Sequence, residues 1–323
     1  MRARVAWSLL AALLTGGVLW WLLTEEVIAA LGEALAQAGI GRLLAAVALV
    51  PAVQWLRAWR FELLLSGEAR LPSGTMFQVT ARLLLLNFVL PFKLGELSFP
   101  VLMKRAFGTG YLRAAGILVL ARLLDLCMVA AILMLGTALV FDRPAFGWSR
   151  TALLAGGLMA LVLPLLAVRV PGLLRWPTSR LPRVAGLLER LNAGMARVRP
   201  LSKSLAAQGL SIAIWLSHSA LAWLAASAIA PGLAIPPVVV AGAASNVAFA
   251  LPVNGIAGLG PPQAAWATVL HWAGAGWDVA AITALVCHGC ILIGVALTGA
   301  LSLIVPAGPR AAPSSATLPG PDS

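Results

Sequence analysis

Charged residues are scarce in this sequence. Asp, Glu, Lys and Arg make up 11% of its 323 residues, whereas a soluble domain carries about 25%. Hydrophobic residues reach 61%, and the mean hydropathy is +0.95. So few charges exclude a water-facing surface over the whole chain. Apolar runs of about 20 residues recur instead, each long enough to cross roughly 30 Å of hydrocarbon. Because only helices satisfy their own backbone within one such run, the sequence predicts a helical integral membrane protein.

Acidic residues and catalytic motifs are also in short supply. The 11 Asp and Glu residues leave little for acid–base catalysis, and no P-loop, G-x-S-x-G, H-E-x-x-H or D-x-D cluster lies in an aqueous segment. The histidines and cysteines lack metal-ligand spacing with an acidic partner, and the C-x-x-C pair is typical of packing on one helix face. These residues are His218, His271, His288, Cys127, Cys287 and Cys290. We therefore expect no enzyme activity, no cofactor and no metal site.

The charge that is present is mostly positive. The formal net charge is +12, which would also suit a nucleic-acid-binding protein. Membrane topology explains this charge better, because basic residues collect in cytoplasmic loops and are attracted to anionic lipid surfaces. We therefore expect membrane lipids, and no nucleic acid, as partners. The sequence does not indicate an oligomeric state.

Counting Lys and Arg in the short loops predicts a topology. Arg2 and Arg4 place the N-terminus inside, and the acidic segment 25–33 is then an outside loop. Arg310 places the C-terminus inside as well, so we expect a multi-pass protein of the cell inner (plasma) membrane with both termini cytoplasmic. About six full transmembrane helices are predicted, at 5–23, 43–65, 112–140, 151–168, 205–228 and 279–305.

The chain divides into one long membrane domain and a short tail. Residues 1–305 form the predicted polytopic domain, with a basic cytoplasmic loop at 169–203. The middle of that loop, residues 184–198, is either an amphipathic helix on the membrane surface or an ordinary solvated loop. The Pro/Ser/Ala-rich tail at 306–323 should be disordered.

Two segments cannot be simple spans under this count. Basic loops flank residues 75–107 and outside loops flank residues 238–272, so each segment must leave on the side where it entered. Each has a short apolar helix, a Pro, a Gly-rich break and a second short helix, a pattern typical of inverted repeats in transporters. We predict two re-entrant helical hairpins, with Pro-kinked spanning helices as the alternative. The backbone-break residues are Pro91, Gly95, Pro252, Gly258 and Gly260.

Five ionisable residues fall in or beside these apolar segments: Arg82, Lys93, Glu96, Arg122 and Asp125. Each costs about 2.5–3.5 kcal/mol on membrane-insertion scales, so such residues are paired or functional. Arg122 and Asp125 are three apart on one predicted helix and can pair, as can Lys93 and Glu96. Arg82 has no acid nearby in sequence. It is the best candidate for contacting an anionic head group, with Lys93 and Arg122 beside it.

These five residues outline a predicted head-group cavity between the two re-entrant segments. Three neutral polar residues complete the candidate binding set: Asn87, Asn246 and Gln263. Arg57 and Arg60 lie near the cytoplasmic end of the second predicted span, and we expect them to snorkel to the interface instead.

The motifs resemble one known family. Asn87-x-x-x-Pro91-x-Lys93-x-Gly95-Glu96, then Arg122-x-x-Asp125, then Leu251-Pro252 with Gly258-x-Gly260, are similar to those of the lysylphosphatidylglycerol synthase/flippase transmembrane family. The resemblance covers about residues 5–305. It implies translocation of a lipid with a charged or glycosylated head group. The chain departs from the family pattern at Phe99, where an Arg is usual, and at Gln263, where a Glu is usual.

The resulting expectation is a lipid flippase or transporter without the aminoacyltransferase domain of the bifunctional family members. Its cargo would be an anionic or head-group-modified lipid, such as a phospholipid, a polyprenyl-linked lipid or a hopanoid, and enzymes of lipid synthesis encoded nearby are candidate partners. Two alternatives are open: a membrane-embedded lipid-phosphate transferase, and a non-catalytic scaffold for envelope lipid synthesis.

Overall fold

The computed structural model describes residues 15–66, 71–141, 149–169, 200–251 and 255–306 of the chain. Within these ranges every regular element is helical, and no strand occurs. After a helical stretch at residues 15–22, the α-helices are α2 (Glu25–Ala36), α3 (Ile40–Ser66), α4 (Gly74–Val89), α5 (Phe99–Phe107), α6 (Tyr111–Val140), α7 (Arg150–Arg169), α9 (Leu201–Ile229), α10 (Ile235–Ala250), α11 (Pro261–Trp272) and α12 (Trp277–Ile304). Two 3₁₀ helices are η1 (Pro91–Ser98) and η4 (Ile256–Gly258). The all-helical prediction is confirmed for these residues.

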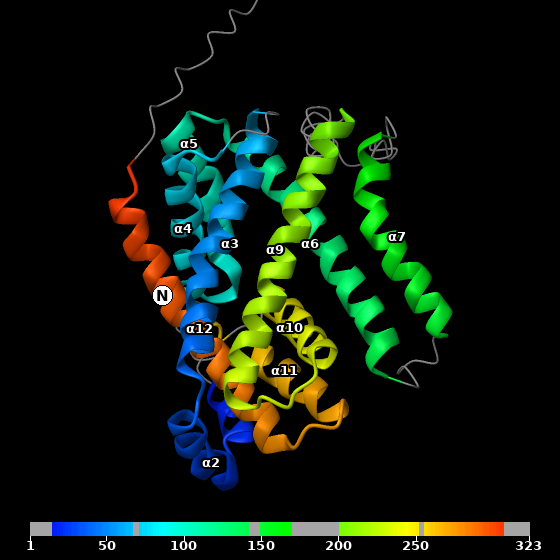
Figure 1. Cartoon of the computed structure of the whole chain (residues 1–323). Helices are drawn as coiled ribbons and strands as arrows, with labels where there is room; N and C mark the ends of the chain where they lie inside the picture. Colours follow the sequence, from blue (N-terminus) through cyan, green and yellow to red (C-terminus); the bar gives the residue numbers. More distant parts are fainter. Residues whose placement is uncertain (1–14, 67–70, 142–148, 170–199, 252–254, 307–323) are drawn as a thin grey trace, which may run out of the picture.

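Four helices are long and apolar enough to cross a membrane: α3, α6, α9 and α12. They run along the length of the molecule, and α7 lies beside α6 (Figure 1). α7 belongs to a shorter apolar class, and the first predicted span lies partly on residues outside the described ranges. The protein is therefore a multi-pass membrane protein, while the count of six full spans stays a prediction.

The acidic segment 25–33 is a helix rather than a loop, which corrects the sequence-based prediction. α2 begins after Thr24, whose hydroxyl accepts a hydrogen bond from the Val27 amide at 3.3 Å. Glu25 and Glu26 occupy its first turn, where negative side chains are stabilised by the helix dipole. A capping residue followed by acids is a helix-start signal, and the loop assignment overlooked it.

Two helices stop short at a Leu-Pro step. α4 ends before Leu90, and α10 ends before Leu251. Both leucines are extended, with ψ near 129° and 146°, because a residue that precedes proline is disfavoured in the helical region. In Figure 1, α4 and α5 lie in the upper half of the molecule, and α10 and α11 lie in the lower half.

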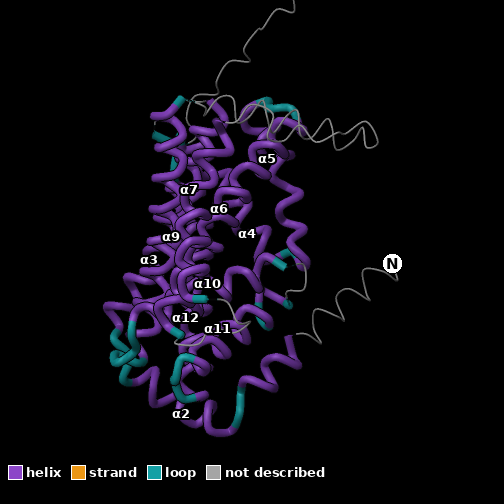
Figure 2. Tube along the Cα trace, turned by 90° about the vertical axis from the view of Figure 1, so that its right-hand side faces the viewer, coloured by secondary structure: helices purple, strands orange, loops and turns teal. Residues whose placement is uncertain are grey.

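Buried apolar side chains form two large groups on either side of the molecular centre. One lies between α3, α9, α10, α11 and α12 and includes Trp266 and Leu270. The other lies between α3, α4, α5 and α6 and includes Phe61, Phe99 and Met103. α3 contributes to both groups and packs against α4, α6, α9 and α12. Figures 1 and 2 show α3 and α9 side by side. The space between the groups holds the polar residues described next.

Two other predictions lie outside the described residues. The middle of the basic loop, 184–198, and almost all of the C-terminal tail, 306–323, belong to ranges that the structure does not describe.

Candidate functional site

A cavity of about 570 Å³ lies at the centre of the helical bundle. Side chains from α3, α4, η1, α6, α9, α10, α11 and α12 line it. Most of its lining is apolar, including Phe88 and Phe249, whose rings are 5.1 Å apart at the ends of α4 and α10. A cavity of this size suits a small-molecule group rather than a macromolecule.

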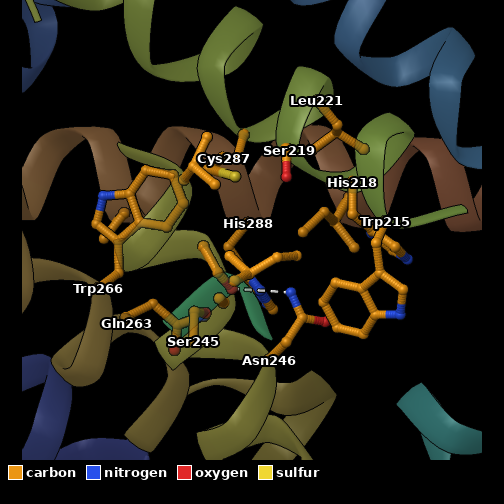
Figure 3. A pocket seen from close by; sticks show the side chains of 17 residues that line it. Trp215, His218, Ser219, Leu221, Ser245, Asn246, Gln263, Trp266, Cys287 and His288 are labelled. Carbon is orange, nitrogen blue, oxygen red and sulfur yellow. Dashed lines mark hydrogen bonds between the residues drawn. The ribbon is translucent and has the colours of Figure 1, made fainter. Parts of the chain in front are cut away.

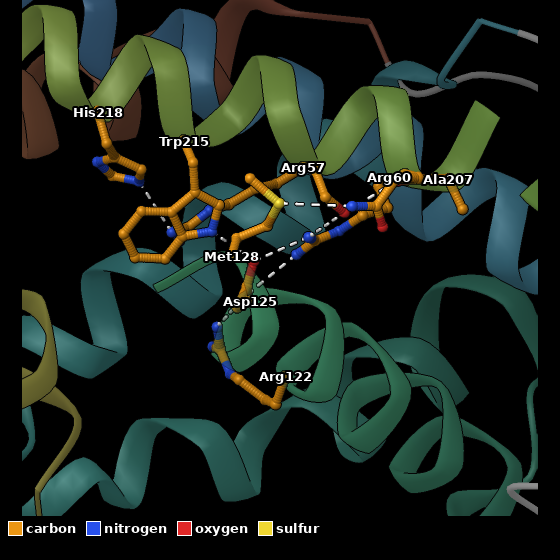
Figure 4. A network of polar contacts seen from close by, with 10 residues as sticks. Arg57, Arg60, Arg122, Asp125, Met128, Ala207, Trp215 and His218 are labelled. Atoms are coloured by element: carbon orange, nitrogen blue, oxygen red, sulfur yellow. Dashed lines mark hydrogen bonds and ion pairs between the residues drawn. The ribbon is translucent and has the colours of Figure 1, made fainter. Parts of the chain in front are cut away.

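Two packed helices present polar side chains to this cavity at helical spacing. On α3 these are Arg57 and Arg60, three residues apart and therefore on one face. On α9, Trp215 and His218 lie on one face, with Ser211 one turn earlier. The facing polar stripes of α3 and α9 form one wall of the site (Figure 4).

The best-buried ion pair of the site joins Arg60 of α3 to Asp125 of α6. The Arg60 nitrogens donate to Asp125 Oδ1 at 2.8 Å and to Oδ2 at 3.1 Å, a two-pronged contact. The side chains are only 1% and 10% exposed, respectively. Arg60 also donates to Ser211 Oγ at 3.1 Å. Removing either charge would leave the other buried without compensation, which is strongly destabilising.

Asp125 is the hub of a larger network (Figure 4). Trp215 Nε1 donates to its Oδ1 at 3.2 Å, and Arg122 Nη1 donates to its Oδ2 at 3.2 Å. Arg122 in turn reaches Glu96 of η1, with 2.8 Å between Nη2 and Oε1. The Arg122–Glu96 pair is about one-third exposed, so it contributes less to stability than the buried Arg60–Asp125 pair. The network ties η1, α3, α6 and α9 together.

Arg57 is bonded differently from the other two arginines. Its Nη2 lies 3.0 Å from His218 Nε2, and its Nε has no hydrogen-bond partner among the described residues. No described carboxylate lies within ion-pair distance of Arg57. Three arginines and two carboxylates line the cavity, so their formal charges, +3 and −2, sum to +1. Arg57 carries the charge that the network leaves uncompensated.

Another part of the cavity wall is polar but carries no formal charge. α10 contributes Ser245 and Asn246, α4 contributes Asn87, and α12 contributes His288. Asn246 Nδ2 donates to the Gly242 carbonyl at 2.9 Å. Asn87 Oδ1 and His288 Nε2 are buried and have no hydrogen-bond partner among the described residues. This wall therefore offers spare hydrogen-bonding groups but no formal charge.

The structure brings five of the eight predicted site residues together on the cavity wall: Asn87, Glu96, Arg122, Asp125 and Asn246. Arg122 pairs with Asp125 as predicted, whereas Glu96 is paired with Arg122 rather than Lys93. The Lys93 side chain is outside the described part of the structure. That these residues bind a head group stays a prediction.

The other two predicted residues lie elsewhere. Arg82 is exposed on α4 and is not among the residues that line the cavity, which corrects the expectation that it faces the site. Gln263 lies in a smaller pocket next to the cavity. Its Oε1 accepts a hydrogen bond from the Gly260 amide at 2.7 Å, which caps the start of α11. A glutamate there could accept the same bond, so capping does not require the charge that is usual in the family.

The sequence-based prediction for Arg57 and Arg60 was wrong. They do not snorkel to the interface but line the cavity, and Arg60 is almost completely buried. A signal was available, because two charges three residues apart in an apolar run mark a common polar face. Their partners Asp125 and His218 lie 65 and 161 residues away in sequence, so no local pattern could identify them.

The predicted backbone breaks have distinct local roles. Gly95 packs against the last turn of α4, where an added Cβ would lie 2.5 Å from the Asn87 amide nitrogen. Gly258 and Gly260 have φ of +75° and +114°, a region that favours glycine. η1 begins at Pro91, and Pro252 is outside the described residues. Phe99, at the family's usual Arg position, is fully buried, with its ring centroid 4.7 Å from that of Phe61.

Within the described residues, no group of three or more His, Cys, Asp or Glu side chains is placed to hold a metal ion.

Comparison with known proteins identifies the family. Searches of curated proteins and of solved structures find no match to the chain. A family profile described as the lysylphosphatidylglycerol synthase TM region matches residues 8–299, which include every described residue of the cavity wall. The chain therefore belongs to the lysylphosphatidylglycerol synthase transmembrane-region family.

Proposed function

We propose that this protein moves an anionic or head-group-modified lipid across the cell inner membrane. The candidate cargoes are a phospholipid, a polyprenyl-linked lipid or a hopanoid. The observation that carries the proposal is a central cavity with an excess positive charge and an apolar mouth. Both properties match a lipid, whose charged head and apolar tails need different surroundings.

The positive charge supports an anionic head group. Arg57 has no described carboxylate partner, and its guanidinium has the geometry for a charge-assisted hydrogen bond to a phosphate oxygen. Arg122 is one-third exposed and lies on the same cavity wall. An anion with one negative charge would neutralise the +1 sum of the lining side chains.

The mouth of the cavity supports a lipid rather than a soluble anion. Leu126 lines the cavity near the middle of α6 and is 62% exposed. Val247 of α10 and Leu251, the residue after α10, also line the cavity and are exposed. Exposed apolar side chains at this depth suit contact with hydrocarbon. The tails could stay in the bilayer while the head group enters the cavity, which reduces the cost of moving a polar group through hydrocarbon.

We also propose that α4–η1–α5 and α10–η4–α11 are re-entrant hairpins from opposite faces of the membrane. Their helices are short, and each pair returns toward the end of the molecule from which it started (Figure 1). Lys104, Arg105 and Arg113 lie around the α5–α6 turn, whereas α2 at the other end carries acids. The positive-inside rule then puts the α5 end and both termini in the cytoplasm.

Transport of this kind changes no covalent bond, so we propose that the protein is not an enzyme. The test is reconstitution of the full chain into liposomes that contain a tail-labelled fluorescent phosphatidylglycerol. Dithionite bleaching measures how much of the label moves from the inner to the outer leaflet. The proposal predicts faster bleaching of the inner pool than in empty liposomes. The proposal would be refuted if the phospholipid, polyprenyl-phosphate and hopanoid probes were each bleached at the same rate in protein-containing liposomes as in empty liposomes.

A further inference from the structure

A second, smaller pocket adjoins the main cavity. Its volume is about 50 Å³, and its walls come from α6, α9, α10, α11 and α12. The residues shared by the pocket and the cavity include His218, Ser245, Asn246 and His288. In Figure 3, the side chains of Asn246 and His288 point into its centre. A single water needs about 10–15 Å³ measured in this way, so the pocket can hold a group of a few polar atoms.

The pocket differs from the main cavity in charge. Among the described residues that line it, none is Asp, Glu, Lys or Arg. An ammonium group would find no carboxylate there, and a phosphate would find no guanidinium or ammonium group. Placing either ion in this pocket would carry an uncompensated desolvation cost. The chemistry of the wall therefore suits a neutral polar group.

Two hydrogen-bonding atoms of this wall have no partner among the described residues. His288 is 8% exposed, and its Nε2 is buried with no partner among the described residues. Asn246 uses its Nδ2 on the Gly242 carbonyl, and no described residue donates to its amide oxygen. Trp266 Nε1, in contrast, is satisfied by Thr283 Oγ1 at 3.1 Å. A buried polar group without a hydrogen-bond partner destabilises the folded protein. His288 Nε2 therefore indicates that a group of a bound ligand supplies the missing hydrogen bond.

We propose that this pocket binds a hydroxyl-bearing part of the lipid head group, such as a glycerol or sugar unit, next to the phosphate. The inference rests on the proposed lipid-binding role of the main cavity. His218 connects the two sites, because it contacts Arg57 at 3.0 Å and lines both spaces. A phosphate held by Arg57 would therefore place the next atoms of the head group at the pocket. His288 and Asn246 would exchange hydrogen bonds with its hydroxyls.

The test compares two lipids that differ only in hydroxyl groups. Phosphatidylglycerol and phosphatidyl-n-propanol have the same tails, the same single negative charge and the same three-carbon head, but the second lacks both hydroxyls. Their affinities are measured by competition against a fluorescent phosphatidylglycerol bound to the purified full chain in detergent. We expect phosphatidylglycerol to bind about tenfold more tightly, since a site built for hydroxyls is left with unpaired groups by the analogue. Equal affinities would overturn the inference.

Variants locate the preference in the pocket. His288→Phe and Asn246→Leu should each bring the affinity ratio toward one, mainly by weakening phosphatidylglycerol. His288→Gln, which keeps hydrogen-bonding atoms, should retain most of the ratio. Thr298→Val is the matched control, because Thr298 is a buried polar residue of α12 that lines neither space. A ratio that survives in both His288→Phe and Asn246→Leu would also overturn the inference.

The binding readout separates this inference from the transport proposal. Hydroxyl-selective binding without movement of any of the three classes of lipid probe in liposomes would refute transport and leave the pocket assignment intact. Movement of both lipids at equal rates, with equal affinities, would refute the pocket assignment and leave transport intact.

Discussion

The segments α4–η1–α5 and α10–η4–α11 have the same plan but different chemistry. Each begins with a helix of 16 residues that stops at a Leu-Pro step, and each continues through a short 3₁₀ helix into a second, shorter helix. Residues 74–110 contain five charged residues, whereas residues 235–277 contain none. The first segment brings Glu96 to the arginine network, and the second brings Asn246 to the neutral wall.

This contrast teaches that a shared backbone plan can support two halves of one site with different tasks. The charged side is built from pairs that cross between α3, α6 and η1. The neutral side depends on turns, with Ala257 at φ +54° and Gly258 and Gly260 also at positive φ. A non-glycine residue in that region is strained, and such strain often accompanies function. We expect changes on the charged side to affect stability and anion binding, and changes on the neutral side to affect head-group choice.

The largest effect should come from Asp125→Asn. The substitution leaves the guanidinium of Arg60 buried without its counter-charge, and breaking a buried pair costs about 3–5 kcal/mol. Thermal unfolding of the purified protein in detergent measures the loss. The double variant Arg60→Leu with Asp125→Leu removes both charges and should recover much of it. On the neutral side, Asn246→Leu buries no charge and should cost far less. Equal losses from Asp125→Asn and Asn246→Leu would remove the basis of the comparison.

Arg57→Gln should reduce movement of anionic lipids with little loss of stability. Arg57 has no described carboxylate partner, so its removal strands no carboxylate. A hydrogen bond to a charged group is worth about 1.5–3 kcal/mol, which corresponds to roughly a tenfold to hundredfold lower rate or affinity. Liposome bleaching assays measure the change.

Arg82→Gln is the matched control, because Arg82 is exposed and outside the cavity. It removes the same charge and should change the rate by less than about twofold. If Arg82→Gln were the more damaging of the two, the arginine-lined cavity would not be the site of anion binding.

Glycines in the two segments should be needed for different reasons. Gly95→Ala would force a methyl group against the Asn87 backbone, at a cost of about 1–3 kcal/mol for overpacking. Gly258→Ala would add the strain of a positive φ and contact with the Phe249 ring. In Gly209→Ala on α9, the added methyl group meets no atom within 4 Å. Thermal unfolding of the variants in detergent should therefore show a lower midpoint temperature for Gly95→Ala and Gly258→Ala, but an unchanged or slightly raised one for Gly209→Ala. Tolerance of Gly95→Ala would contradict the close packing of η1 on α4.

Among the substitutions of cavity-lining residues, the smallest effect should come from Glu96→Gln. The Glu96–Arg122 pair is partly exposed, and such pairs contribute about 0.2–1 kcal/mol. Arg122 keeps its hydrogen bond to Asp125. The equilibrium constants for unfolding and for anion binding should therefore each change by less than about fivefold. Thermal unfolding and the competition assay check this together. A loss as large as that of Asp125→Asn would place the hub of the network at η1 instead of α6.

Several features were determined by the sequence alone. The scarcity of charge required a helical membrane protein, because no aqueous surface could be built from it. The Leu-Pro steps at 90–91 and 251–252 located both helix breaks, since the clash before proline is local. The i, i+3 spacing of Arg122 and Asp125 predicted their pairing for the same reason, and the structure bears it out.

Tertiary structure decided which charges face the cavity. Arg82 and Arg57 are both arginines in apolar helices, and only the packing of α3 against α9 turns Arg57 inward beside His218. Arg60 meets Asp125 across 65 residues of sequence. Pairing between helices depends on the rotation of each helix about its axis and on which neighbours it packs against. Those are set by the burial of many apolar side chains together, so no local pattern of residues contains them.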